Sequence, residues 1–478
     1  MVAVALLGSS FALAYVSYRY SQIKKISLPG LVHGGRDSAG PVEVVPLGGG
    51  RYRGPATTIL LVGNNTRTGL EPNESRYFGS SSEVGGARSD VTMLLHLDPV
   101  KGATILSIPR DLFVPLPPHS TVGSVGKVDA ALNDGPEQLV EAITNDLGIP
   151  INHYVSINFD GFQHVIDALG GINMNFPLPL RDGYSGLNIV NTGCQHLNGG
   201  AALAVVRARH LQYKVYGRWL DDPQSDLSRI RRDHEFLTVL AKTIRAKGLT
   251  NPLRANAVIG NLVDQVTIDN GLSVSFMLSL LRAYGGLNPD TTPELTLPVT
   301  LVPGVNYTYS GAGYGSVVFP SQPANAETIA QFLGTAPVLT QPSAVEVVDR
   351  SGIGAGSRVA DALAADGFNI TSRSTAYAPA QPSETVVRYQ PGNLPAAERV
   401  MDALSGAAIM TADLQVPPST IVIDVGSVVA ASSGLPAVSP TPGSPTTVAS
   451  APAAVPTPAG AAITPSAAPL DFFDPRGC

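Results

Sequence analysis

Three short runs of aliphatic and β-branched residues, each bordered by polar side chains, constrain the fold of this chain more than any other feature. They cover residues 57–63, 91–95 and 103–108. Runs of this length and composition predict buried strands. Because the polar groups stand at the strand ends, they are expected along one rim of a sheet, where α/β folds commonly bind ligands.

The rim combines arginines with oxygen-bearing side chains. Its members are Asn65, Arg67, Arg88, Asp90, Arg110 and Asp111. Guanidinium groups bind phosphate oxygens in a two-pronged geometry, and a hard cation such as Mg²⁺ binds one or two side-chain oxygens together with phosphates. The rim therefore suits a pyrophosphate that carries a divalent ion. Ordinary solvated ion pairs at strand ends explain this stretch, taken alone, equally well.

The size and charge of the chain narrow its class. With 478 residues, it is long enough for more than one domain. Its net charge of -6 argues against nucleic acid as a main partner, because binding nucleic-acid phosphates needs a basic face. It holds two cysteines, Cys194 and Cys478, so one disulfide at most is available. A bridge between them and a buried free thiol at Cys194 both remain open, as does an isolated Cys478.

The N-terminal end predicts a membrane anchor. Residues 2–18 carry no charge and are mostly apolar, which is close to the shortest length that spans a bilayer. We expect a single-pass anchor over 1–25 and a spacer over 26–55, with the rest of the chain outside the cytoplasm. A signal peptide is the alternative, but no basic region precedes the run. The basic residues that follow it would favour the opposite orientation, so we also expect a basic segment ahead of residue 1.

The following residues alternate between strand and helix patterns. The expected elements are a helix at 137–147, a strand at 153–158, a helix at 161–169, a strand at 171–175, a helix at 201–209, a long helix opening at Asp226, a helix at 273–284, a strand at 294–302 and a helix at 324–333. This alternation indicates an α/β body with a covered sheet.

Two of these helices carry further arginines. Arg207 and Arg209 end the first, while Arg229 and Arg232 lie three residues apart near the start of the second and are expected to share a face. Taken singly, each pair is an ordinary complement to a helix end. Together with the rim they form three arginine clusters beside apolar elements, which is hard to explain by chance because burying unpaired arginine is costly.

A second, small α/β domain is expected at 344–427, after a linker at 335–343. Its expected elements are strands at 345–348, 368–371, 384–389 and 420–425 and helices at 359–365 and 396–404. It holds no cluster of acids, histidines or cysteines, which favours a binding or regulatory module. Residues 428–478 are expected to be a disordered tail rich in Ala, Pro, Ser and Thr, although its ending at 470–474 could be a contact motif.

These motifs together resemble the LytR-CpsA-Psr family of bacterial cell-wall ligases. The matching segments are 60–67, 88–90, 107–111, 127–132, 193–199, 204–209 and 226–232. The resemblance is strong over 57–247, weaker to 333, and 344–427 resembles the LytR C-terminal domain. It implies a three-layer α/β/α sandwich with a mixed central sheet over 56–334 and a long apolar groove for a lipid.

The resemblance also implies an activity. Such proteins are membrane-anchored phosphotransferases that act on the outer face of the cell membrane, moving a glycopolymer from a polyprenyl-pyrophosphate carrier onto the 6-hydroxyl of muramic acid in peptidoglycan. In an actinobacterium of mycobacterial type the polymer would be arabinogalactan or a related glycan.

The resemblance assigns roles by position. The residues expected to hold the pyrophosphate are Arg88, Arg110, Arg207, Arg209, Arg229 and Arg232. Asp90 would bind Mg²⁺ and, with Arg110, act in catalysis. The family usually has Asp at position 65, whereas Asn65 coordinates a metal without charge, which weakens the metal site. Asn65 also favours the alternative reading, a non-catalytic envelope protein that binds lipid-linked glycan or a partner protein.

Overall fold

The computed structural model describes the chain in segments. These are residues 21–32, 45–48, 51–53, 56–66, 87–224, 226–247, 266–301, 306–334, 344–376, 382–431 and 470–478. The apolar stretch 2–18 and Arg67 lie outside them. Among the helices that are described, none combines the length and the apolar character that crossing a membrane requires.

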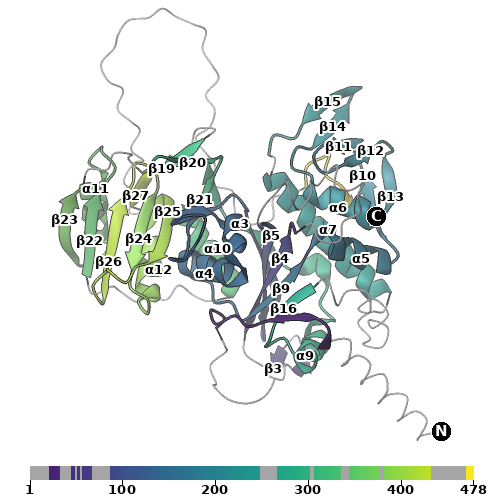
Figure 1. Ribbon diagram of the computed structural model, residues 1–478, viewed down its shortest axis with the longest axis horizontal. Coiled ribbons are helices and arrows are strands. Elements are labelled where there is room, and N and C mark those ends of the chain that lie inside the picture. The colour runs from purple at the N-terminus through teal and green to yellow at the C-terminus, as the bar shows by residue number, and fades with distance from the viewer. Residues whose placement is uncertain are drawn as a thin grey trace, which may run out of the picture.

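A mixed sheet forms the centre of the molecule (Figure 1). Its seven strands, in spatial order, are β1 (Lys24–Ile26), β16 (Val266–Asp269), β9 (His153–Ile157), β4 (Thr57–Asn64), β5 (Ser89–Asp98), β6 (Gly102–Ile108) and β17 (Glu294–Thr296). β4 pairs with β9 in parallel and with β5 in antiparallel orientation, and β5 and β6 are antiparallel. The three apolar runs at residues 57–63, 91–95 and 103–108 therefore lie in three adjacent strands.

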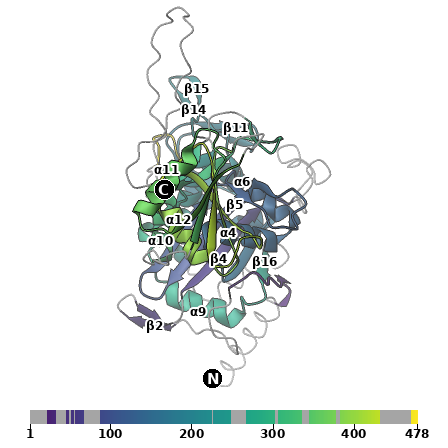
Figure 2. The ribbon, with the colours of Figure 1, turned by 90° about the vertical axis from the view of Figure 1, so that its left-hand side faces the viewer.

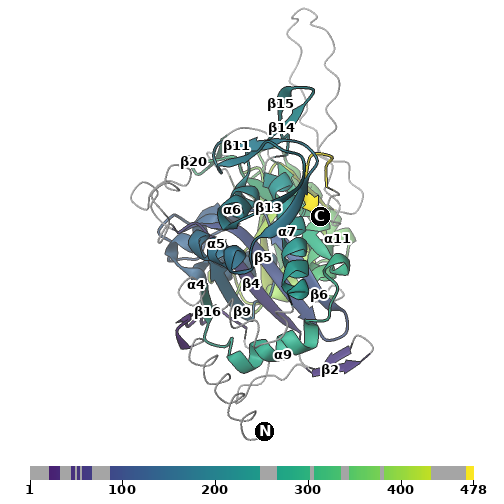
Figure 3. The ribbon, with the colours of Figure 1, turned by 90° about the vertical axis from the view of Figure 1, so that its right-hand side faces the viewer.

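Helices cover both faces of this sheet. On one face Leu60 and Leu94 share a core with Leu139 of α4 (Pro136–Leu147) and Phe332 of α10 (Ala324–Leu333). The opposite face is overlain by three further helices, as Figure 3 shows from the right-hand side. They are α5 (Phe159–Ala168), α6 (Gly199–Arg207) and α7 (Asp226–Ala246). The predicted α/β/α sandwich is confirmed.

Asparagine caps fix where α5 and α6 begin. The Asn158 side chain accepts a hydrogen bond from the Gly161 amide at 2.8 Å, and Asn198 accepts one from Ala201 at 2.9 Å. At Gly199 the two helices approach so closely that a Cβ atom would lie 2.4 Å from the Gln163 carbonyl oxygen. Glycine is thus required there, and α5 and α6 stand side by side above the sheet.

Smaller elements complete the N-terminal domain. They are β2 (Val45–Gly48), β3 (Arg51–Arg53), β7 (Phe113–Pro115), β8 (Val125–Lys127), α3 (Val128–Ala131), β10 (Ile172–Phe176), β11 (Leu180–Asp182), β12 (Leu187–Ile189), β13 (Gly193–Leu197), β14 (Gln212–Val215), β15 (Arg218–Asp221), α9 (Val274–Tyr284), β18 (Val299–Leu301), β19 (Tyr307–Tyr309), β20 (Ala312–Gly315) and β21 (Val318–Gln322). The strand expected at 294–302 was wrong as one element: it is divided at Pro298 into β17 and β18, which belong to different sheets.

The C-terminal domain is built on a second sheet, which also includes β18 and β21, and its helices lie on one side of that sheet (Figure 2). Its elements are β22 (Ala344–Asp349), α11 (Ala355–Ala365), β23 (Ile370–Thr375), β24 (Thr385–Tyr389), α12 (Leu394–Asp402), β25 (Leu404–Ala412), β26 (Thr420–Val425) and β27 (Val429–Ala431). β25 was not predicted, because its alanine- and glycine-rich sequence lacks the β-branched pattern of a strand.

β25 joins the two domains. It pairs with β24 on one side and with β21 of the N-terminal domain on the other, where Ser321 lies opposite Ala407. Nearby, Asp146 of α4 accepts a hydrogen bond from the Met410 amide at 2.9 Å, and the Tyr389 hydroxyl donates one to the Asn145 carbonyl at 3.0 Å. The two domains therefore share a continuous sheet.

The prediction of a disordered tail over 428–478 was wrong at both of its ends. Residues 429–431 form β27, which pairs with β25. At the far end Cys478 forms a disulfide with Cys194, and β28 (Arg476–Gly477) pairs with β10. The chain thus returns to the N-terminal domain, as the C label in Figure 1 shows. Residues 432–469 lie outside the described segments.

Candidate functional site

A pocket of about 550 Å³ lies between the central sheet and helices α5, α6 and α7. Its apolar walls include Met93, Val155, Phe162, Phe236 and Leu240. Charged residues also line it; they are Arg88, Asp90, Arg110, Arg207, Arg209, Arg229 and Asp233. Five of the six arginines that the sequence nominated thus meet at one apolar cavity, although they come from β5, the β6–β7 connection, α6, α7 and the loops beside them.

Arg110 is held between two carboxylates. It pairs with Asp90 on β5 and, at 3.2 Å, with Asp129 on α3. Asp129 is fully buried and also lies 3.9 Å from the half-exposed Arg88. Burial raises the pKa of Asp129, although the charges of Arg110 and Arg88 oppose this. The network fixes the direction of the Arg110 side chain before any ligand binds.

Asp111 organises a second group of cations. It accepts hydrogen bonds from Arg209 and from Lys127, both at 2.7 Å. Burial alone would raise the pKa of Asp111, but the Lys127 hydrogen bond and the charge of Arg209 outweigh it, so the pKa lies below its usual range. Asp111 is therefore an ionised anchor, and Arg209 also reaches Asp226 at 3.0 Å.

The start of α7 contributes Arg229 and Asp233. Arg229 is buried and lies 3.0 Å from Asp226 and 3.6 Å from Asp233. Burial raises the pKa of Asp233 to about 7, against the opposing charges of Arg229 and Arg232. The pocket therefore contains one carboxyl group that changes its charge near neutral pH.

Arg232 does not reach this pocket, contrary to the prediction that it faces the same ligand as Arg229. Its side chain is 1% exposed and reaches the Ala208 carbonyl and the Asp222 loop instead of the pocket. There it pairs with Asp222 at 3.2 Å and with Asp474 of the tail at 3.5 Å, and it donates a hydrogen bond to the Ala208 carbonyl. Its role is to tie the tail and the Asp222 loop to the helix.

The remaining predicted residues line the cavity. The Arg207 guanidinium lies 4.3 Å from the ring centre of Phe159, which orients it by a cation–π contact. The Asn65 side-chain oxygen accepts a hydrogen bond from the Arg88 amide at 2.9 Å. Asn65 thus positions the start of β5, a structural role that its amide performs without charge.

Sequence reasoning missed three acidic or basic groups of this network. Lys127 and Asp129 lie in the matching segment 127–132 but were given no role, and Asp233 lies just after the matching segment 226–232. One signal was available: Asp129 begins an apolar helix that has to be buried, so its charge needed a partner. The identity of that partner, Arg110, depends on the β7–β8 hairpin folding back.

The side-chain oxygens that line the pocket decide whether it suits a divalent cation. No cluster of three or more histidine, cysteine, aspartate or glutamate side chains suitable for a metal occurs in the segments that the structure describes. Asp90 and Asn65 both line the pocket and offer one carboxylate and one amide oxygen. That is the minimal protein contribution to a Mg²⁺ ion that takes its other ligands from phosphates and water, so the residues fit.

Known proteins match this chain over both of its domains. Residues 43–329, more than half of the chain, match the LytR_cpsA_psr family model, and residues 343–428 match the model described as LytR cell envelope-related transcriptional attenuator. The probable cell wall biosynthesis protein LcpB of Corynebacterium glutamicum is 34% identical over 240 residues, which cover 50% of this chain and 54% of that protein.

Other relatives carry names that state an activity. The polyisoprenyl-teichoic acid–peptidoglycan teichoic acid transferase TagV of Bacillus subtilis is 31% identical over 229 residues, 46% of this chain and 55% of that protein. The LytR-Csp2A-Psr enzyme from Actinomyces oris superposes with a TM-score of 0.46 at 23% identity, over 66% of this chain and 97% of that one. The chain spans about half the length of the curated relatives it matches. From its family-model match, the chain belongs to the LytR-CpsA-Psr family.

Proposed function

We propose that this protein is a phosphotransferase that moves a glycopolymer from a polyprenyl-pyrophosphate carrier onto peptidoglycan. The observation that carries the proposal is the convergence of Arg88, Arg110, Arg207, Arg209 and Arg229 on one apolar pocket. A polyprenyl pyrophosphate has the matching composition, since a doubly charged anhydride is joined to a hydrocarbon chain. The names of relatives such as TagV and TagU are consistent with it.

The reaction exchanges one phosphorus–oxygen bond for another. The sugar hydroxyl of the acceptor forms a bond to the phosphorus that carries the glycan, the bond from that phosphorus to polyprenyl phosphate breaks, and Asp90 takes the hydroxyl proton. Asp90 and Asp129 hold the Arg110 guanidinium from two sides, which keeps it next to Asp90 and so beside the phosphorus that is attacked. Prepositioned charge of this kind stabilises the charge that develops on phosphoryl oxygens.

Asp90 and Asn65 would hold a Mg²⁺ ion beside the pyrophosphate. Such an ion, when bound, would neutralise part of the phosphate charge. Asn65 contributes no charge, so we expect weak metal binding, to be measured as the Mg²⁺ concentration that half-activates transfer.

The apolar walls between the sheet and α5, α6 and α7 would take the first isoprene units of the carrier. We propose an arabinogalactan-type glycan as the polymer, which a comparison of donors carrying different glycans would test. We also propose that a membrane anchor precedes the described residues and that the body lies outside the cytoplasm. The disulfide between Cys194 and Cys478 supports this location, because disulfides persist in oxidising compartments.

The decisive experiment measures transfer of a labelled glycan from a polyprenyl-pyrophosphate donor to peptidoglycan oligomers by the purified full chain. Arg110→Ala is expected to lower the rate by about 100- to 1,000-fold, because it removes one preorganised cation from the phosphate. The matched control is Arg373→Ala, which breaks an exposed pair with Asp361 on the other domain. Full activity of Arg110→Ala with unchanged folding would refute the proposal.

One observation favours a second candidate function, a binding protein without catalysis. Asn65 is uncharged and its oxygen already accepts the Arg88 amide hydrogen bond. A wild-type chain that binds the donor tightly but transfers nothing, with or without Mg²⁺, would establish this alternative.

A further inference from the structure

A second cavity, of about 420 Å³, lies where the two domains meet. We call it the interdomain pocket. Its floor is provided by β24, β25 and β26, and its walls include the β7–β8 hairpin, through Pro115 and Val125, and the β19–β20 hairpin, through Tyr309. Because β21 and β25 pair across the domain boundary, floor and walls belong to one sheet-linked body. The cavity is therefore present before any ligand arrives.

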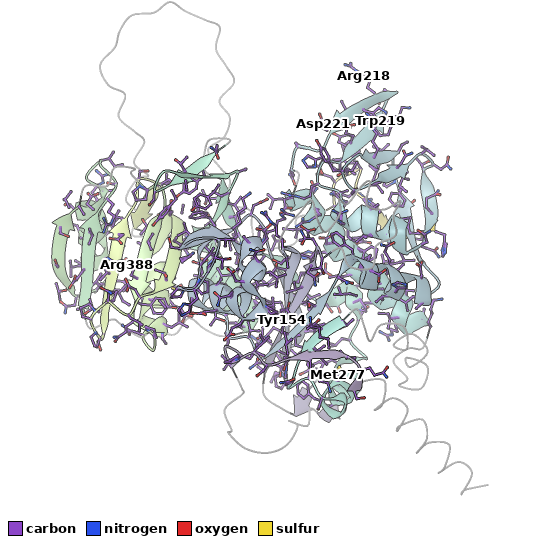
Figure 4. All side chains as sticks on the ribbon, viewed as in Figure 1. Tyr154, Arg218, Trp219, Asp221, Met277 and Arg388 are labelled. Atoms are coloured by element: carbon purple, nitrogen blue, oxygen red, sulfur yellow. A yellow bond between two sulfur atoms is a disulfide. The ribbon has the colours of Figure 1, made fainter. Side chains whose placement is uncertain are left out.

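The alternation of residues along the floor strands divides this sheet into an apolar and a partly polar face. Val387 of β24, Met410 of β25 and Ile423 of β26 pack into the core with α11 and α12. The neighbours of those residues point the other way and line the cavity; they are Val386, Arg388, Ile409, Thr411 and Asp424. Figure 4 labels Arg388 on this sheet. This second face is therefore only partly polar, because Ile409 is buried against Phe113 and Phe319, and its polar part borders the cavity.

The charges of the interdomain pocket balance one another. Asp424 accepts a hydrogen bond from Arg350 at 2.8 Å and lies 2.9 Å from Arg388, which also donates to Asp413 at 3.1 Å. An anion such as phosphate would have to displace a carboxylate here. A neutral ligand would not, and could use the guanidinium donors and carboxylate acceptors together.

We propose that the interdomain pocket binds an uncharged saccharide segment of about one or two rings, a size that suits a cavity of this class. The hydroxyls of a sugar both donate and accept hydrogen bonds, which matches Arg350, Arg388 and Asp424 in one place. The Tyr309 ring at the wall offers a flat apolar surface with a hydroxyl at its edge, a combination that suits the ring of a sugar. The site is separate from the phosphate chemistry and does not depend on it.

Titration calorimetry of the full chain tests the proposal without any transfer reaction. The probes are an N-acetylglucosamine disaccharide, an arabinofuranose oligosaccharide and inorganic phosphate. The first two are both uncharged saccharides, and which of them binds tells whether the site takes an acceptor-type or a polymer-type glycan. Arg388→Ala is expected to weaken saccharide binding by about tenfold or more, because a charged hydrogen-bond donor is lost. Arg373→Ala, on an exposed pair of the same domain, is the matched control.

A second variant guards against a folding defect in Arg388→Ala, and thermal melting is recorded for each protein. Thr411→Phe fills the cavity from β25 without removing a charge, and it too should abolish saccharide binding. The proposal is overturned if the wild-type chain binds neither saccharide, if phosphate alone binds, or if both pocket variants bind saccharide as the wild type does. Loss of transfer with saccharide binding retained would count against the proposed function only.

Discussion

Arg229 and Arg232 stand three residues apart on α7, both are nearly inaccessible to solvent, and both pair with aspartates. Arg229 lines the pocket, where its partners Asp226 and Asp233 belong to the same helix. Arg232 does not line the pocket, and one of its partners, Asp474, comes from the far end of the chain. Two arginines of one motif thus serve different purposes: one is available to a ligand, and the other holds the structure together.

The largest expected effects come from replacing each of these two arginines with alanine. Arg232→Ala should destabilise the protein by about 3 to 5 kcal/mol, because it leaves Asp222 buried without its cation and removes one of the two arginines that pair with Asp474. Arg229→Ala should instead lower transfer by about 100- to 1,000-fold when assayed well below its melting temperature. Thermal unfolding and initial rates measured on both variants check this. A reversal, with Arg232→Ala folded but inactive, would mean that the pocket extends to Arg232.

Removing the disulfide should weaken the part of the structure that Arg232 and the C-terminal tail hold together, and not the pocket around Arg229. Cys478→Ser is expected to cost about 2 to 5 kcal/mol, because the bridge to Cys194 closes a loop of 284 residues that restricts the unfolded chain. Melting with and without a thiol reductant is the measurement. The reductant should lower the wild-type melting temperature and leave that of the variant unchanged. Equal sensitivity of both proteins would contradict the assignment.

Asp233 gives the Arg229 side a pH dependence. Its folded pKa of about 7 lies above the usual value of about 3.9, so between these values the folded protein keeps a proton that the unfolded chain has released. Raising the pH through this window therefore destabilises the folded state, and the effect ends above the folded pKa. Asp233→Asn removes the titration.

The difference in unfolding free energy between Asp233→Asn and the wild type should thus change in favour of the variant by up to about 3 kcal/mol between pH 5 and pH 7. Chemical denaturation at several pH values measures it. A constant difference would show that Arg229 keeps the carboxylate ionised throughout.

The smallest effect is expected at Asp471. Its side chain is 43% exposed and pairs with Arg231 at 3.0 Å, whereas the fully buried Asp474 reaches the same guanidinium. Asp471→Asn should cost less than about 1 kcal/mol, since exposed ion pairs contribute little. Thermal unfolding beside Asp474→Asn, which should cost several times more, makes the comparison internal. Similar losses in both would mean that burial does not distinguish the two.

Much of this arrangement could be read from the sequence, and the limits have physical reasons. The apolar runs and the spacing of their arginines predicted β4, β5 and β6 and most of the pocket. The separation of Arg229 from Arg232 could not be predicted, because a spacing of three places residues near one another but does not choose their partners. The partner of Arg232 is Asp474, and no local pattern connects positions so far apart.

The same limit explains the missed elements. β25 has a sequence without strand character and forms because two other strands, β21 and β24, offer their edges. Asp129 was recognisable as part of a motif, but its contact with Arg110 depends on how the β7–β8 hairpin folds back. Tertiary pairing rather than local propensity decided each of these cases.

The shared sheet has a practical consequence for dividing this protein. A chain cut in the linker at 335–343 would leave β21 with an open edge and would expose Phe113 and Phe319, which form one core with Ala407 and Ile409 of β25. Unpaired strand edges next to exposed aromatic surface are templates for aggregation. Each half, prepared alone, is therefore expected to be poorly soluble, and the folding unit is larger than either of the two family segments.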